Sequence, residues 1–135
     1  MKLSERIIAG PTLGTDVLRI VLCAILFTHG SYRFLHGDVT GLADLLKAEG
    51  VPLPLFTASL ITLAETLGTA LVLFRLMVLP TCLVLATIEF AGIMMFNRHN
   101  GFFTVGAGDG GWEYNALLIT CNLVTIWENR KRPFW

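Results

Sequence analysis

Single carboxylic acids inside long apolar runs are the residues of this sequence best placed to do chemistry. Glu65 is the one charged residue between Leu55 and Phe74, and Glu89 is the one charged residue between Leu76 and Phe96. A charged group at the centre of a membrane helix costs about 2.5–3.5 kcal/mol and usually faces the interior of the helix bundle, so it is a functional candidate by default. We expect Glu65 to be catalytic and Glu89 to bind ligand, with a purely structural, hydrogen-bonded role for each as the alternative.

Polar residues of the first apolar run share one helical face. His29, Arg33 and His36 follow one another at spacings of three or four residues near the end of the run Val17–Leu35, which places them on the same side of a helix. We expect His29 to act with Glu65 as the second catalytic residue, and Arg33 and His36 to bind ligand. The alternative for His36 is a solvated helix end.

A stretch rich in glycine and aromatic residues, Asn97–Ala116, separates the last two apolar runs. Glycine allows positive φ and close backbone approach, so the composition favours an ordered loop over an ordinary helix. We expect the loop to fold over the helices and to supply His99, Glu113 and Tyr114 to the ligand site. As alternatives, His99 is a solvated residue near water, and Glu113 offsets the dipole of the helix that it begins.

The candidate residues converge at one depth. A rise of about 1.5 Å per helical residue places Glu65, Glu89 and His29 about 10–16 Å below the outer ends of their runs, between the bilayer centre and the outer surface. The histidines lack HxH and HExxH spacing, so no metal site is predicted. The glycines lack the order of a phosphate-binding loop, which argues against nucleotide binding.

Composition assigns the chain to the membrane proteins. Its 135 residues suffice for one domain, and 54% are hydrophobic while 15% are charged, against about 25% charged in soluble domains. The formal net charge is zero, which gives no reason to expect a nucleic-acid partner. The three cysteines lie in apolar runs without CxxC spacing, and we expect them to be packing residues.

The apolar runs predict an all-α membrane protein, a single domain over residues 1–135. We expect an antiparallel bundle of four transmembrane helices at about 17–35, 54–74, 76–97 and 112–128, since a crossing needs about 20 apolar residues. A short amphipathic segment, Val39–Gly50, should lie at the interface between the first two helices. The glycine-rich loop should join the last two helices on the outer side.

Basic residues indicate the orientation. Four crossings put both termini on one side, and that side would carry seven basic residues against three on the other: Lys2, Arg6, Arg19, Arg75, Arg130, Lys131 and Arg132 against Arg33, Lys47 and Arg98. Because basic residues favour the cytoplasmic side, we expect both termini in the cytoplasm.

Several short motifs resemble the DoxX family of small membrane proteins. They are HG followed by a basic residue (His29 to Arg33), glutamate followed by glycine (Glu65 to Gly68), HNGFF (His99 to Phe103) and GGWEY (Gly110 to Tyr114). The sequence departs from the usual pattern in carrying Arg33 where lysine is common, and in having Glu89 in mid-helix. The resemblance implies four-helix proteins of the bacterial inner membrane, some similar to DoxD-type subunits of thiosulfate:quinone oxidoreductases.

The resemblance and the clustered polar groups lead to one functional expectation and two alternatives. We expect a quinone-interacting or anchoring subunit of a membrane oxidoreductase complex, with quinone as the cofactor. Its partners would be the lipid bilayer and another oxidoreductase subunit. The alternatives are a small proton or solute transporter or channel, and a non-catalytic scaffold that docks a periplasmic partner. Whether the chain is an enzyme by itself, and its oligomeric state, stay open.

Overall fold

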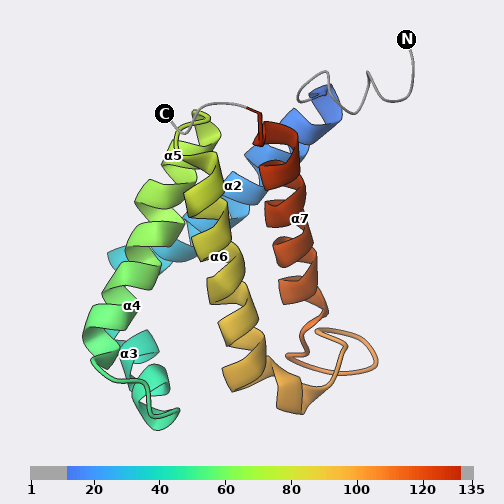
Figure 1. The fold of residues 1–135 in the computed structure, drawn as a ribbon. Coiled ribbons are helices and arrows are strands. Elements are labelled where there is room, and N and C mark those ends of the chain that lie inside the picture. The colour runs from blue at the N-terminus through green and yellow to red at the C-terminus, as the bar shows by residue number, and fades with distance from the viewer. Residues whose placement is uncertain (1–11, 132–135) are drawn as a thin grey trace.

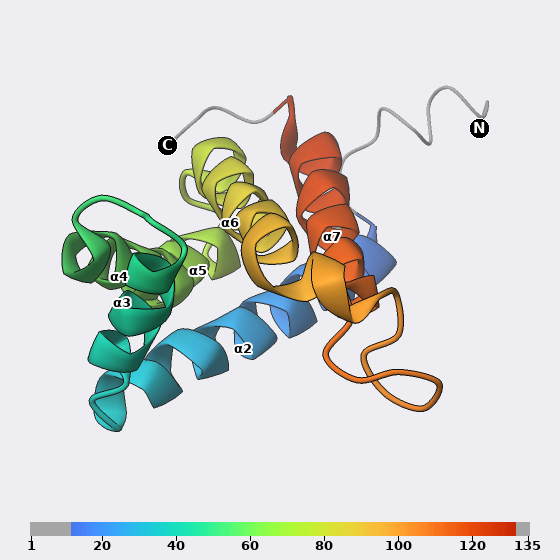
Figure 2. The ribbon, with the colours of Figure 1, turned by 90° about the horizontal axis from the view of Figure 1, so that it is seen from below.

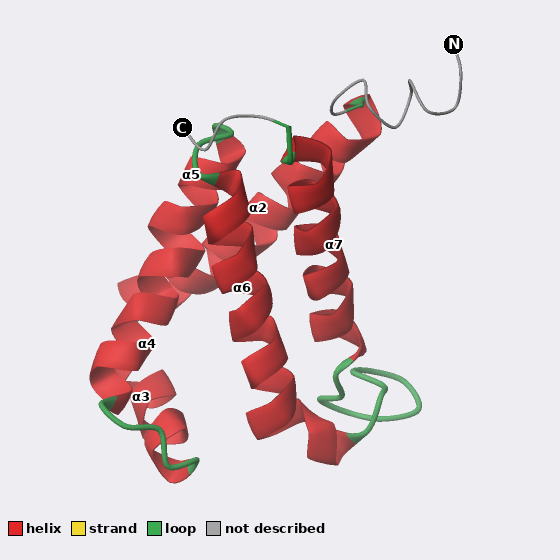
Figure 3. Cartoon of the chain, in the orientation of Figure 1, coloured by secondary structure: helices red, strands yellow, loops and turns green. Residues whose placement is uncertain are grey.

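The described part of the chain is a series of helices, joined by short connections except for the longer loop before the last helix. The computed structural model describes residues 12–131, and within that range it contains helices, turns and loops but no strand. The elements are α2 (Leu13–Leu35), α3 (Val39–Ala48), α4 (Pro54–Leu63), the π-helical turn η1 (Ala64–Gly68), α5 (Thr69–Leu73), α6 (Val78–Gly92), the π-helical turn η2 (Ile93–Asn97), the 3₁₀ turn η3 (Arg98–Asn100) and α7 (Glu113–Asn129) (Figures 1 and 3).

Some of these elements follow one another without a break and form one continuous helix, called a rod below. Three rods are long and apolar enough to cross a membrane: Leu13–Leu35, Pro54–Leu73 and Val78–Asn100. The prediction of an all-helical chain with membrane-spanning helices is therefore confirmed. The remaining rod, α7, has 17 residues and rises about 26 Å at 1.5 Å per residue. This is less than the thickness of about 30 Å of the hydrocarbon core, so a fourth crossing stays a prediction.

Three of the rods stand beside one another, and α2 crosses them. The rod α4–η1–α5 stands beside α6, and α6 stands beside α7, while α2 crosses the group obliquely (Figures 1 and 2). The start of α2 and the end of α7 lie at one end of the bundle. Helix α3, packed against α4, and the loop before α7 lie at the other end (Figure 1).

Apolar side chains cover the outside of the bundle, and polar ones lie within it. Phe27, Leu60 and Leu83 each expose nearly half of their surface (47%, 49% and 49%), whereas Glu65 is 5% exposed and Asn122 is fully buried. In water this distribution would leave large apolar patches uncovered. The chain is therefore a membrane protein whose outer surface suits a lipid bilayer.

A buried arginine fastens the start of α2 to the end of α5. Arg19 is buried, and its Nη1 donates to the backbone carbonyl of Val72 at 3.2 Å and also to that of Leu73. Both carbonyls lie at the C-terminal end of α5, where a cation is favourable, and that of Val72 also accepts from the backbone N–H of Arg75 at 3.0 Å. Asp16 accepts hydrogen bonds from both Arg19 and Arg75, which joins α2 to the tight turn before α6.

The crossing of α2 over η1 is set by a glycine. A Cβ atom at Gly30 would lie 2.8 Å from Cβ of Glu65 and 2.9 Å from Cγ2 of Thr66. No side chain fits there without moving the two helices apart. The contact also brings Arg33, one turn further along α2, within reach of Glu65.

Replacing Gly30 by alanine should therefore destabilise the protein by about 1–3 kcal/mol, because overpacking forces the backbones apart. Thermal unfolding in detergent micelles measures the effect. Gly14→Ala on the same helix is the matched control, since its added Cβ would meet only Oγ1 of Thr12 at 3.8 Å and both variants share the helix-propensity gain of alanine. Equal unfolding temperatures for the two variants would contradict the crossing described here.

Candidate functional site

An ion pair joins α2 to the π-helical turn η1. Arg33 Nη1 donates to Glu65 Oε2 at 2.6 Å and to Oγ1 of Thr62 at 3.3 Å. The side chains of Arg33 and Glu65 are only 17% and 7% exposed. Thr62 in turn donates to the carbonyl of Ala58 at 2.8 Å, so its hydroxyl is oriented to accept from Arg33. A pair this well bonded keeps both charges stable away from water.

A second polar pair joins α6 to α7. Asn115 Nδ2 donates to Glu89 Oε2 at 2.7 Å. The other carboxyl oxygen, Oε1, makes no hydrogen bond with any residue in the described range. Glu89 is thus fixed by a neutral amide through one oxygen, and its second oxygen is left for another group.

A cavity of about 380 Å³ lies between the two pairs. This is at the lower end of the range of about 300–1,000 Å³ for small-molecule sites. Five of its lining residues carry a charge or an amide: Arg33, Glu65, Glu89, Asn97 and Asn115. The other walls are mostly apolar and come from α3, the connection after it, α4, α6 and η2: Leu42, Leu46, Val51, Thr57, Ile61, Thr87, Ile88, Ala91, Gly92, Met95 and Phe96. The cavity therefore suits a flat or compact ligand with a few polar atoms.

Two of the rods that line the cavity widen into a π-helical turn beside it. Glu65 lies in η1, and Asn97 ends η2. Thr62 and Thr66 bond back to the carbonyls four residues earlier, an arrangement that bends helices. Single π-helical turns are frequent at functional sites, and here they place Glu65 and Asn97 on the cavity wall.

The structure brings three of the predicted site residues together: Arg33, Glu65 and Glu89 all line the cavity. His29 and His36 do not. His29 shares a helical face with Arg33, as the spacing predicted, but it is exposed. His36 stacks on Tyr32, with ring centroids 3.9 Å apart.

The glycine-rich loop keeps its own predicted site residues away from the cavity. Oε1 of Glu113 accepts from the backbone N–H of Thr104 at 2.8 Å, so this acid closes the loop. His99 Nε2 accepts from Nε of Arg98 at 3.0 Å, and both are exposed, as is Tyr114. The loop extends away from α3 and α4 (Figure 2). It therefore does not cover the cavity in the way that the sequence suggested.

The loop is ordered by backbone pairing. Trp112 N–H donates to the carbonyl of Gly101 at 3.2 Å, and Glu113 N–H donates to that of Phe102 at 3.0 Å. Gly111 is buried in this pairing, and a Cβ atom there would lie 2.5 Å from the carbonyl group of Phe102. Asn97 connects the loop to the cavity, because Nδ2 of this cavity residue donates to the carbonyl of Gly110 at 2.8 Å.

Two amides and one hydroxyl were missed as site residues. Asn97 and Asn115 line the cavity, and Thr62 bonds Arg33. Asn115, Asn122 and Asn129 recur every seven residues. This spacing places them on one helical face and could have indicated that Asn115 meets a polar group of another helix. Among residues 12–131, no three His, Cys, Asp or Glu side chains group in a way that could hold a metal ion.

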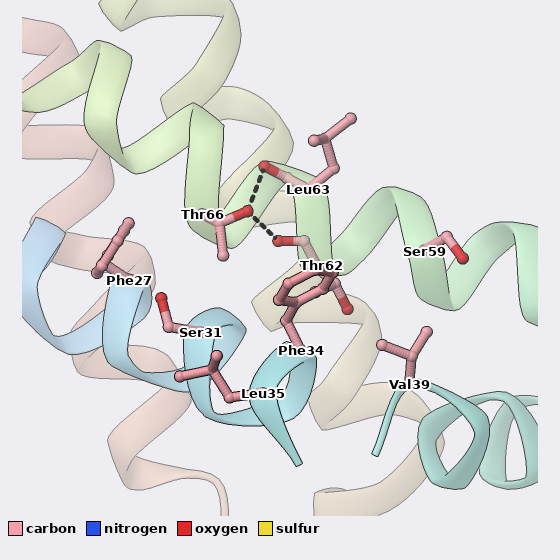
Figure 4. A pocket seen from close by; sticks show the side chains of 9 residues that line it. All are labelled: Phe27, Ser31, Phe34, Leu35, Val39, Ser59, Thr62, Leu63 and Thr66. Atoms are coloured by element: carbon pink, nitrogen blue, oxygen red, sulfur yellow. Dashed lines mark hydrogen bonds between the residues drawn. The ribbon is translucent and has the colours of Figure 1, made fainter. Parts of the chain in front are cut away.

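An apolar groove of about 670 Å³ lies between α2 and α4 and is separate from the cavity. Figure 4 shows Phe27, Ser31 and Phe34 on one side of it, and Thr62 and Thr66 on the other. Thr62 both lines the groove and bonds Arg33. The ion pair is therefore one side chain away from the apolar outer surface.

Removing one partner of the ion pair should lower the free energy of unfolding much more than removing both partners. Arg33→Leu leaves Glu65 buried without its cation, and we expect a loss of about 3–5 kcal/mol in unfolding free energy. The double variant Arg33→Leu/Glu65→Leu should recover most of that loss, because no unpaired charge remains. Detergent-induced unfolding followed by circular dichroism measures both. A double variant as unstable as the single one would contradict the pairing.

Comparison with known proteins gives one match. A family model described as DoxX matches residues 14–98, from the first turn of α2 to the start of η3 and thus more than half of the chain. No curated protein and no solved structure matches the sequence. The matched range includes Arg33 of α2 and Glu65 of η1, the two residues of the ion pair. It ends before the HNGFF and GGWEY motifs. The chain belongs to the DoxX family.

Proposed function

We propose that this DoxX protein binds a quinone ring in the cavity between the two polar pairs and serves as the quinone-interacting or anchoring subunit of a membrane oxidoreductase complex. The observation that carries the proposal is the cavity itself: a space of about 380 Å³ with the Arg33–Glu65 pair and Glu89 on its wall, among apolar side chains. The family resemblance to quinone-linked subunits supports the same ligand. A single chain of this size would depend on a partner subunit as electron donor.

The cavity residues fit a quinone ring by their hydrogen-bonding capacity. Arg33 uses Nη1 for Thr62 and Glu65, and its Nε and Nη2 donors have no partner within residues 12–131. The oxygens of a quinone accept hydrogen bonds, so Arg33 would hold one of them. Apolar residues such as Ile61, Ile88 and Phe96 line the cavity and would contact the ring faces. A bound quinone supplies two-electron, two-proton redox chemistry.

The chain's own residues would position the ring and handle protons. Glu65 and Thr62 fix the guanidinium of Arg33, so its charge stays in place beside a ring oxygen. Glu89 would hold or release a proton at Oε1. His29 is exposed one turn from Arg33, and we assign it to proton exchange at the cavity edge rather than to ring contact. His36, His99, Glu113 and Tyr114 would act only on the outer side.

In the cell we place the protein in the bacterial inner membrane, with α7 as a fourth crossing. The Asn115, Asn122 and Asn129 stripe of α7 faces inward in large part, since Asn122 and Asn129 are buried, which leaves its apolar side for lipid. Four crossings and the excess of basic residues near the termini put both termini in the cytoplasm. The loop before α7 would then face the periplasm.

Quinone binding should depend on the guanidinium of Arg33. We expect wild-type protein in detergent to bind a short-chain quinone in isothermal titration calorimetry, and Arg33→Lys to bind at least about tenfold more weakly, because a lysine lacks the planar fork of donors. Lys47→Met, on the exposed surface of α3, should bind like wild type. Absence of binding by wild type would overturn the proposal. Solute or proton flux in proteoliposomes without quinone binding would favour the transporter instead.

The proposed orientation has a direct test. A cysteine introduced at Asp109, exposed in the loop, should react with a membrane-impermeant maleimide added to intact spheroplasts. A cysteine at Lys131 should react only after the membrane is permeabilised, and the unsubstituted chain gives the background of its own cysteines. The reverse pattern would contradict the orientation, and labelling of both sites in intact cells would contradict the fourth crossing.

A further inference from the structure

The two sides of the cavity differ in hydrogen-bonding character. Arg33 offers only donors, as every arginine does. Glu89 offers Oε1, which makes no hydrogen bond with the described residues, while its Oε2 is held by Asn115 at 2.7 Å. When ionised, this oxygen can only accept. A ligand that satisfies both sides must accept a hydrogen bond from Arg33 and donate one to Glu89.

The charges around Glu89 give it no cation of its own. The elements that line the cavity with it present Arg33 from α2, Glu65 from η1 and the neutral Asn115 from α7. Leu42 and Leu46 of α3 are apolar. Arg33 is already bonded to Glu65 at 2.6 Å. One cation therefore faces two carboxyl groups, and the remaining acceptor is available for a hydroxyl group.

Quinones and quinols differ in this respect. The carbonyl oxygens of a quinone only accept hydrogen bonds, whereas each hydroxyl of the quinol both donates and accepts. A quinone carbonyl beside an ionised Glu89 would bring two acceptors together and leave both unsatisfied, which is unfavourable in a buried site. A quinol hydroxyl would satisfy the carboxylate.

We infer that Glu89 determines which redox form the cavity prefers: the reduced, hydroxyl-bearing quinol while Glu89 is ionised, and the quinone when Glu89 is protonated or replaced by a donor. The inference rests on the proposed quinone site and goes beyond it by assigning the selectivity to one oxygen atom. Glu89 is a specificity-determining residue in this scheme, and Asn115 is the positioning residue that directs Oε1 toward the ligand.

Glu89→Gln replaces the hydrogen-bond acceptor on this side of the cavity with a donor, with little change in side-chain shape. The glutamine Oε1 can take over the hydrogen bond from Asn115, which leaves Nε2 as a donor toward the ligand. We expect quinone affinity to rise relative to quinol affinity in this variant. Glu49→Gln makes the same chemical change at an exposed carboxylate after α3 and serves as the matched control.

The test measures dissociation constants of a short-chain benzoquinol and of its quinone by calorimetry under anaerobic conditions at pH 8. We expect wild type and Glu49→Gln to bind the quinol about tenfold more tightly than the quinone, a ratio that corresponds to about 1.4 kcal/mol. In Glu89→Gln the ratio should fall to about one or below.

The outcomes separate this inference from the proposed function. If wild type binds both forms and the ratio does not change in Glu89→Gln, the inference is wrong and the quinone site stands. If wild type binds neither form, the proposed function fails and the inference fails with it. A ratio that changes equally in Glu49→Gln would also overturn the inference, because the effect would then come from net charge alone.

Discussion

The buried ion pair between Arg33 and Glu65 is the interaction on which the rest of the structure depends. Neither charge is stable alone among apolar helices, so α2 and the α4–α5 rod must cross where the two groups meet at 2.6 Å. Gly30 permits that crossing because it has no side chain. Helices α6 and α7 pack beside this crossing, and the cavity lies between the Arg33–Glu65 and Glu89–Asn115 pairs.

The apolar runs allowed much of this fold to be predicted. Three spanning rods lie within a few residues of their expected bounds, because a long uncharged run has few structures open to it besides a membrane helix. Family membership also followed from short motifs. The burial of Glu65 was predictable from its energetic cost, but its partner was not. Spacing shows which residues share a face of one helix, and the crossing at Gly30 decides which residue of another helix that face meets.

The glycine-rich loop shows what composition alone could not predict. Its glycine content predicted order, and backbone pairing around Gly111 supplies that order. The direction in which the loop leaves α6 depends on that pairing, which composition does not encode, so His99 and Glu113 were assigned to a cavity that they do not line. Asn97, at the start of the same stretch, both lines the cavity and bonds the loop. The chemical roles of the site residues stay predictions.

The π-helical turn at Ala64–Gly68 has a consequence for how the chain tolerates changes in length. Its wider turn holds an additional residue without breaking the helix. This lets Glu65 face α2 while Val72, further along, packs with Cys23 and Cys82. Deleting one residue here would restore an ordinary α-helix and leave the later residues on the faces that they now occupy, whereas a deletion elsewhere in the rod would rotate everything after it by about 100°. The turn is thus the place in the rod where losing one residue keeps its polar and apolar halves in register.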